Sequence, residues 1–267
     1  MSQLTATLGG GTRRGSWREV WRGLQPIERA CYVAGMVLIA SGLFHLVVFA
    51  VAGGPWDGPV SWRKPFTFGV SFGATLIAVA WLSKYLPLSE RTRRVLLAVF
   101  AVDCFVEVGG ITLQAWRKVP SHVDMQGAFN TAVSMILAVG GGVLVVVLGR
   151  MAIAALRGTP EQAPSMRLAI RAGFVTLVVG LLAGAAMIAR GVPLARSGHQ
   201  QEAYHDVGFL KPVHFVSLHG VLVLPALAWL VGRLDWSEER RVRAVLVGTA
   251  AYGVAIVGAL VISLASM

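Results

Sequence analysis

Long apolar runs alternate with short polar segments along the whole chain. Seven runs are about 20 residues long, the length that crosses roughly 30 Å of hydrocarbon. Backbone groups facing lipid must be satisfied within the segment, and the runs lack the alternation of barrel strands, so each run predicts a transmembrane helix. The predicted spans are 31–53, 66–86, 95–115, 127–149, 168–190, 209–231 and 244–265. The expected fold class is therefore an all-α membrane protein with seven helices.

The second half of the chain repeats features of the first half in the same order. The Ala-Gly-x-Val motif at 34–37 returns at 172–175, and Lys64-Pro65 returns as Lys211-Pro212. This pattern predicts two three-helix repeats, helices one to three (31–115) and five to seven (150–267). A loop and the fourth helix (116–149) join them. Because the connector is a single span, the repeats cross the membrane in the same direction and are parallel.

Composition and charge strengthen this picture. Hydrophobic residues make up 55% of the chain and charged residues 14%, which excludes a soluble domain. Of the 24 Lys and Arg residues, 17 fall on the side of the N-terminus. By the positive-inside rule the N-terminus is cytoplasmic, the C-terminus lies outside, and the protein is multi-pass in the bacterial inner (plasma) membrane. The net charge of +11 is thereby a topology signal, so the expected partner is the lipid bilayer and not nucleic acid.

Residues 1–30 form the predicted cytoplasmic tail. Trp17, Val20, Trp21 and Leu24 share one helical face in a basic segment. This pattern is typical of a short interfacial helix on the inner leaflet, and a plain basic tail is the alternative.

Polar motifs lie near the outer ends of the predicted helices. They are Trp62-Arg63-Lys64-Pro65-Phe66, Glu107 with Gln114, Arg117 and Ser121-His122, and His214 with His219. In these motifs the chain resembles a bacterial family of uncharacterised seven-helix membrane proteins. The resemblance covers most of the chain. It gives weight to these positions and implies no particular chemistry.

Ionisable side chains inside spans are costly and are functional candidates by default. The candidates are His45 in the first span, Asp103 and Glu107 in the third, and His214 and His219 in the sixth. Asp103 and Glu107 are four residues apart and share a helical face. The first repeat supplies one histidine and both carboxylates, and the second supplies two histidines. This asymmetry favours a single composite site in the outer half of the bilayer, between the repeats.

The first expected use of this site is to bind haem b or another transition metal for redox or sensing work. His45 and His219 are the predicted axial ligands, with His214, Glu107 and Arg117 around them, and a quinone or another redox partner would exchange electrons. A non-haem site would use His45, His214 and His219 with a carboxylate. Five residues separate His214 from His219, about 140° around a straight helix, which opposes their sharing one ion.

The alternative is a secondary transporter or proton-coupled carrier. Here Glu107, Asp103 and the histidines bind protons in sequence, and a small molecule or ion is the substrate.

A third prediction is a membrane metal-dependent hydrolase. Ser41-x-x-x-His45, an acidic residue in the third span and a late histidine pair resemble the adiponectin-receptor and ceramidase kind, but the pair is spaced five apart instead of four. A hydrogen-bonded cluster that only holds helices together is the remaining interpretation. The sequence leaves open whether the protein is an enzyme.

Two further groups of polar residues lie at the outer ends of the helices. Gln114, Arg117 and His122 crowd the link between the third and fourth spans. Lys64 and Lys211 stand at the outer ends of the second and sixth spans. Such lysines often extend toward water without a further role, and the alternative is a cationic rim that attracts a carboxylate, a headgroup or haem propionates.

Overall fold

The computed structural model describes residues 17–158 and 162–265, and these form helices and connecting loops. The helices are α1 (Trp17–Gly23), α2 (Pro26–Ala52), α3 (Arg63–Ser83), α4 (Glu90–Trp116), α5 (Ala128–Arg157), α6 (Pro164–Arg196), α7 (Gln200–Asp206), α8 (Lys211–Val231) and α9 (Glu238–Ala265). Seven of them, α2 to α6, α8 and α9, are long and apolar enough to cross a membrane. The predicted all-helical fold with seven spans is confirmed at this level.

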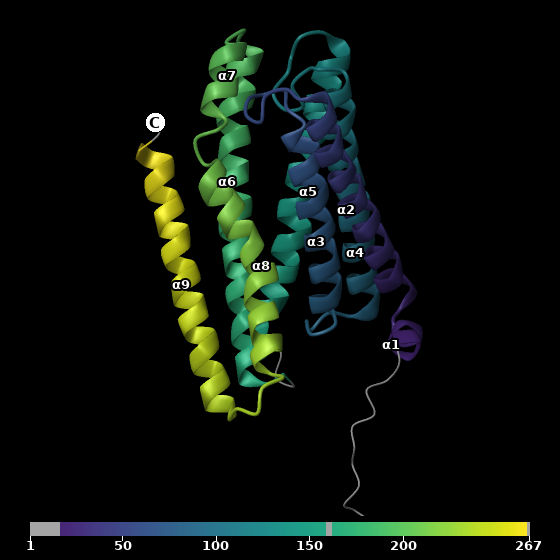
Figure 1. The fold of residues 1–267 in the computed structure, drawn as a ribbon, viewed down its shortest axis with the longest axis vertical. Coiled ribbons are helices and arrows are strands. Elements are labelled where there is room, and N and C mark those ends of the chain that lie inside the picture. Colours follow the sequence, from purple (N-terminus) through teal and green to yellow (C-terminus); the bar gives the residue numbers. More distant parts are fainter. Residues whose placement is uncertain (1–16, 159–161, 266–267) are drawn as a thin grey trace, which may run out of the picture.

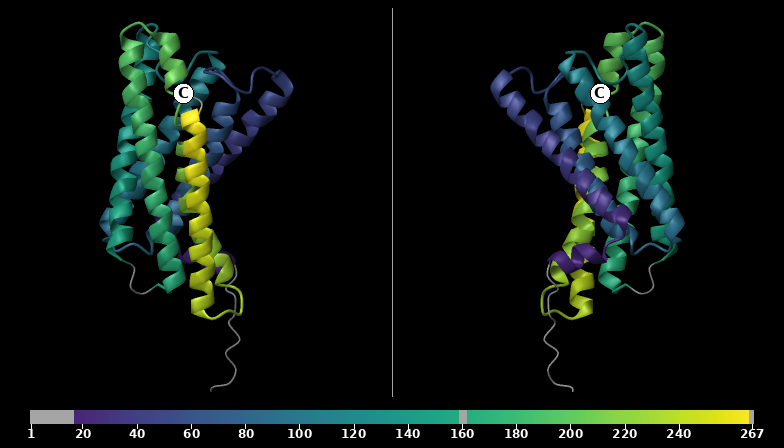
Figure 2. Two further views of the ribbon diagram at one scale, coloured as in Figure 1. Left: turned by 90° about the vertical axis from the view of Figure 1, so that its left-hand side faces the viewer. Right: turned by 90° about the vertical axis from the view of Figure 1, so that its right-hand side faces the viewer.

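The long helices lie along one direction and leave two ends that differ in structure (Figure 1). We call them the α7 end, where α7 and the loops 53–62 and 117–127 lie, and the α1 end, where α1 and the loops 84–89 and 232–237 lie. Figure 2 shows that α2 runs obliquely to α5, α6 and α9. By these helix bounds, every predicted site residue belongs either to the α7 end or to the middle of a long helix.

Two helix pairs carry the closest packing, α2 with α3 and α6 with α8. In the first pair, a Cβ added at Gly69 would lie 2.8 Å from the Cα of Gly42, which is backbone and cannot move aside. In the second pair, a Cβ at Gly180 would lie 2.8 Å from the amide nitrogen of Leu218. Small residues thus let both pairs approach closely. Contacts of α3 with α8 and of α5 with α6 join the two halves.

The buried core lies mainly among α2 to α6. Its largest members with almost no exposure include Phe100 on α4 and Phe174 on α6. By contrast, α9 contacts α6 and α8 and leaves most of its surface uncovered, as suits a helix whose other face meets lipid. The polar side chains described next are exceptions within this apolar core.

Candidate functional site

Two carboxylates of α4 are buried against α5. Glu107 is 3% exposed and Asp103 is 7% exposed. Both face Gly140, where an added Cβ would collide with Glu107 Oε1 and lie 3.0 Å from Asp103 Oδ1. Gly140 is therefore the residue that makes room for the pair.

One oxygen of each carboxylate is buried without a hydrogen-bond partner among the described residues. Within the described part of the chain, neither Glu107 Oε1 nor Asp103 Oδ2 has a hydrogen-bond partner. The charged group that acts on Glu107 is Asp103, which has the same sign. An ionised carboxylate buried without a partner costs several kcal/mol, roughly, so such a group usually takes up a proton or a cation. Chemically, the pair is suited to bind and release a positive species.

His45 lies in an aromatic cluster at the α7 end. Its Nδ1 donates to the Ser41 carbonyl at 2.7 Å, and Trp116 Nε1 donates to its Nε2 at 3.1 Å. The ring stacks on Trp62 with centroids 6.1 Å apart. Because Nε2 accepts a hydrogen bond, these contacts assign the proton to Nδ1. His45 thereby ties α2 to the end of α4 and to the start of α3.

The two histidines of α8 face different neighbours. His214 bonds through Nδ1 to the Gly180 carbonyl of α6 at 2.7 Å. His219 bonds through Nδ1 to the Phe215 carbonyl at 2.6 Å and through Nε2 to Ser71 Oγ of α3 at 2.9 Å. The divergence agrees with their five-residue spacing.

These contacts bear on the predicted haem. In the described conformation both ring nitrogens of His45 and of His219 have hydrogen-bond partners, and the His45 ring is covered by two tryptophans. The described residues also contain no group of three His, Cys, Asp or Glu side chains arranged to hold a metal ion. In this conformation the described side chains are therefore not arranged to ligate a haem or a three-ligand metal ion. Haem and metal binding stay untested predictions.

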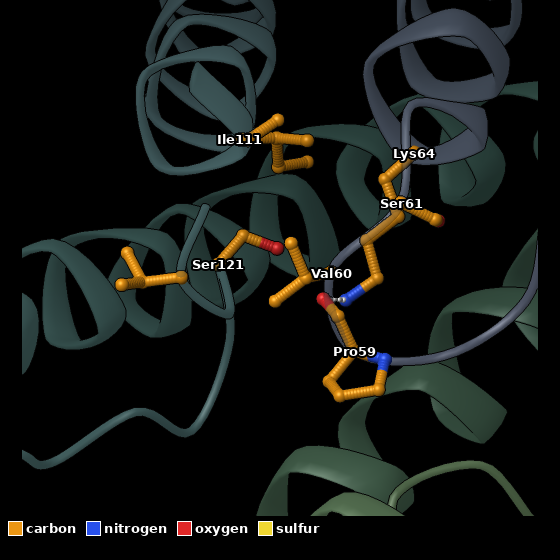
Figure 3. A pocket seen from close by; sticks show the side chains of 8 residues that line it. Pro59, Val60, Ser61, Lys64, Ile111 and Ser121 are labelled. Carbon is orange, nitrogen blue, oxygen red and sulfur yellow. Dashed lines mark hydrogen bonds between the residues drawn. The ribbon is translucent and has the colours of Figure 1, made fainter. Parts of the chain in front are cut away.

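Lys64 and Lys211 come together at the α7 end, where α3 and α8 begin. The positive charges repel one another electrostatically: Lys211 acts on Lys64, and Arg63 acts on both lysines. Lys64 Nζ donates to the Pro59 carbonyl at 2.8 Å (Figure 3). The hollow drawn there is narrow, with no space that admits a water molecule. Its lining is Pro59, Val60, Ser61, Lys64, Ile111, Ala115, Val119 and Ser121.

His122 belongs to the same region. It lies in the loop between α4 and α5, with its Nδ1 3.0 Å from Ser121 Oγ and its ring 6.0 Å from that of Phe68. Burial, followed by the positive charges of Lys64, His214 and Lys211, lowers the pKa of His122 to about 3. His122 is therefore a neutral member of a positively charged cluster.

Gln114 and Arg117 hold the loop between α4 and α5. Arg117 donates to Gln114 Oε1 at 2.5 Å and to Asn130 Oδ1 at 2.6 Å. Asn130 in turn donates to Asp124 Oδ2 at 2.9 Å, and Ser134 Oγ bonds to the Asp124 backbone. The network gives Gln114 and Arg117 a structural role in holding this loop.

The structure does not gather the candidate residues into the single composite site that the sequence predicts. It brings Lys64, Lys211, His122 and His214 together, pairs His219 with Ser71, and places the carboxylates separately between α4 and α5. Sequence reasoning missed Ser71, Asn130 and the role of Trp116. The sequence could have indicated Ser71, because it shares one helical face with the polar residues Lys64 and Thr67.

Comparison with known proteins gives no match to a family model, a curated protein or a solved structure, so the geometry carries the functional argument. The resemblance to the bacterial membrane family stays a prediction.

Proposed function

We propose that the protein is a proton-coupled membrane carrier in which Asp103 and Glu107 bind the coupling proton. The observation that supports it most is the pair of buried carboxylates with oxygens that no described residue satisfies. Intramembrane carboxylates of this kind occur in proton relays of pumps and transporters.

The surroundings of the pair suit a site that changes shape. Gly140 is followed by Gly141 and Gly142, and an added Cβ at either of these two would meet nothing within 4 Å. A helix with three consecutive glycines is weakened, so α5 is the element that we expect to shift when the carboxylates gain or lose a proton. This shift would open the pair toward one end of the molecule and then the other.

The two helix pairs with matching glycine packing support the predicted parallel repeats. In this proposal α2 to α4 form one repeat, α6, α8 and α9 form the other, and α5 connects them. The proton site then lies between the first repeat and the connector. The α7 end faces the outside, and the N-terminus is cytoplasmic.

Reconstituted vesicles provide the test. We would trap a pH-sensitive dye inside proteoliposomes of the full chain and add a panel of ions and small metabolites. The proposal expects that at least one substrate changes the internal pH and that Glu107→Gln removes this change, because the amide cannot carry the proton. Glu202→Gln, at an exposed carboxylate of α7, is the matched control and should retain it. Equal substrate-driven pH changes in the wild type and in Glu107→Gln would contradict the proposal.

A further inference from the structure

The α3 and α8 helices begin side by side at the α7 end, and each carries a lysine followed by a proline in its first turn. Within the described residues, neither Lys64 nor Lys211 forms an ion pair. The positive ends of the two helix dipoles point the same way and add to the positive potential.

Acidic groups do little to offset these charges. Asp57 is the carboxylate that acts on Lys211, but it also lies 3.5 Å from Arg63, and its side chain is 87% exposed. His122 adds no negative charge. The region around Lys64, Lys211 and Arg63, which we call the mouth, therefore retains an excess of positive charge. Like charges that are partly shielded from water favour the binding of a counter-ion.

A buried hydroxyl supplies a second, independent observation. Ser61 is 6% exposed, and its Oγ has no hydrogen-bond partner among the described residues. It lines the same hollow as Lys64. Lys64 meanwhile donates to a backbone carbonyl, Pro59, which occupies the acceptor position that a ligand oxygen would take (Figure 3). A lysine and a hydroxyl at one hollow, with a second lysine nearby, are the donors that an oxyanion needs.

We infer that the mouth between Lys64 and Lys211 binds an oxyanion, a carboxylate or phosphate group, with Ser61 donating a further hydrogen bond. The hollow as it stands admits no ligand, so on binding Lys64 exchanges the Pro59 carbonyl for the anion while the segment that carries Pro59 and Ser61 moves outward to make room. Where the anion is free in solution, it defines the substrate class of the carrier, a step that rests on the proposed function. The same chemistry also fits the headgroup of an anionic lipid.

The test has one arm for each source of the anion. In the first arm, inorganic phosphate and succinate are titrated calorimetrically into the full chain in neutral detergent, at constant ionic strength. In the second arm, nanodiscs made with and without phosphatidylglycerol report lipid retained by the protein. Lys64→Gln and Lys211→Gln should each weaken binding about tenfold or more, since each removes a hydrogen bond from a charged donor. Ser61→Ala should weaken it about two- to tenfold.

Controls separate charge at this site from general effects. Lys84→Gln removes a lysine at the α1 end and should leave binding unchanged, and Lys211→Arg should restore most of the affinity. Loss of binding in both glutamine variants supports the inference, in the first arm for a soluble anion and in the second arm for a headgroup. No binding in either arm, or binding unaffected by both variants, overturns it. Glu107→Gln should still bind the anion, so a failed anion site and a failed proton site are distinguishable.

Discussion

The carboxylate pair owes its position to an absent side chain. Asp103 and Glu107 can lie between α4 and α5 because Gly140 has no Cβ to meet them. The polar contacts of the other candidates are likewise specific: His45 bonds to Trp116, and His219 bonds to Ser71. At the residue scale, the chemistry open to each candidate therefore depends on the side chain that it contacts.

Gly140→Ala tests this arrangement. The new methyl group would collide with Glu107 Oε1, the end of a side chain that must turn aside within a buried site, so the free energy of unfolding should fall by about 1 kcal/mol. Thermal unfolding in detergent measures the change. Gly141→Ala is the matched control, since nothing lies within 4 Å there, and it should be neutral or stabilising by up to about 1 kcal/mol. A Glu107→Ala background should remove most of the Gly140→Ala cost. Equal effects at positions 140 and 141 would contradict the packing.

His122 predicts a pH dependence of stability. Its pKa is lowered to about 3 in the fold, whereas an unfolded histidine has a pKa of about 6.5. Between these values the unfolded chain binds more protons, so stability falls as the pH drops from about 6.5 toward 3. In His122→Gln this contribution is absent. Unfolding midpoints between pH 8 and pH 4 should thus decline less in the variant, and parallel declines would show that the imidazole does not contribute.

The sequence identifies the costly residues but not their contacts. Asp103 and Glu107 stand out because ionisable groups are rare inside apolar spans. Their contact with Gly140 depends on how α4 and α5 rotate about their axes, which no single-sequence pattern determines. For the same reason the pairing of His45 with Trp116 was not predicted, and a histidine proposed as a ligand has a hydrogen-bonded structural place in this conformation.

At the scale of elements, hydropathy predicts the spans, and helix propensity extends them. The fourth span was expected at 127–149, but α5 continues to Arg157. The hydropathy criterion stops at Arg150, whereas the following alanines and leucine are good helix formers. The close pairing of α2 with α3 was predictable from its glycines, while the meeting of α3 with α8 was not, because contacts between distant helices leave no local pattern.

Gly69→Ala tests the pairing of α2 with α3. Its Cβ would lie 2.8 Å from backbone atoms of Gly42 and of Leu38, which can yield only by separating the helices. We expect a loss of about 1–3 kcal/mol in the free energy of unfolding. Gly109→Ala, on a surface with nothing within 4 Å, controls for the general effect of alanine in a helix. A Gly69→Ala protein as stable as the control would show that the two helices are not so close.

At the scale of the whole molecule, the charge distribution predicts orientation. Of the 24 Lys and Arg residues, 17 belong to the N-terminal tail or to the loops and helix ends on the side of the α1 end, which predicts that this end is cytoplasmic. Reporters fused to the loops 84–89 and 117–127 should therefore be active on opposite sides, with 84–89 inside. The reverse pattern would turn the anion mouth toward the cytoplasm and reverse the proposed direction of transport.

The central claim is that Asp103 and Glu107 bind a proton within the membrane, and infrared titration tests it most directly. Protonated carboxyl groups have a C=O stretching band that carboxylates lack. In pH-difference spectra of the reconstituted protein, the account predicts such a band, reduced in Glu107→Gln and in Asp103→Asn and unchanged in Asp57→Asn. A spectrum without this band, or with a band that both variants leave intact, would contradict the account.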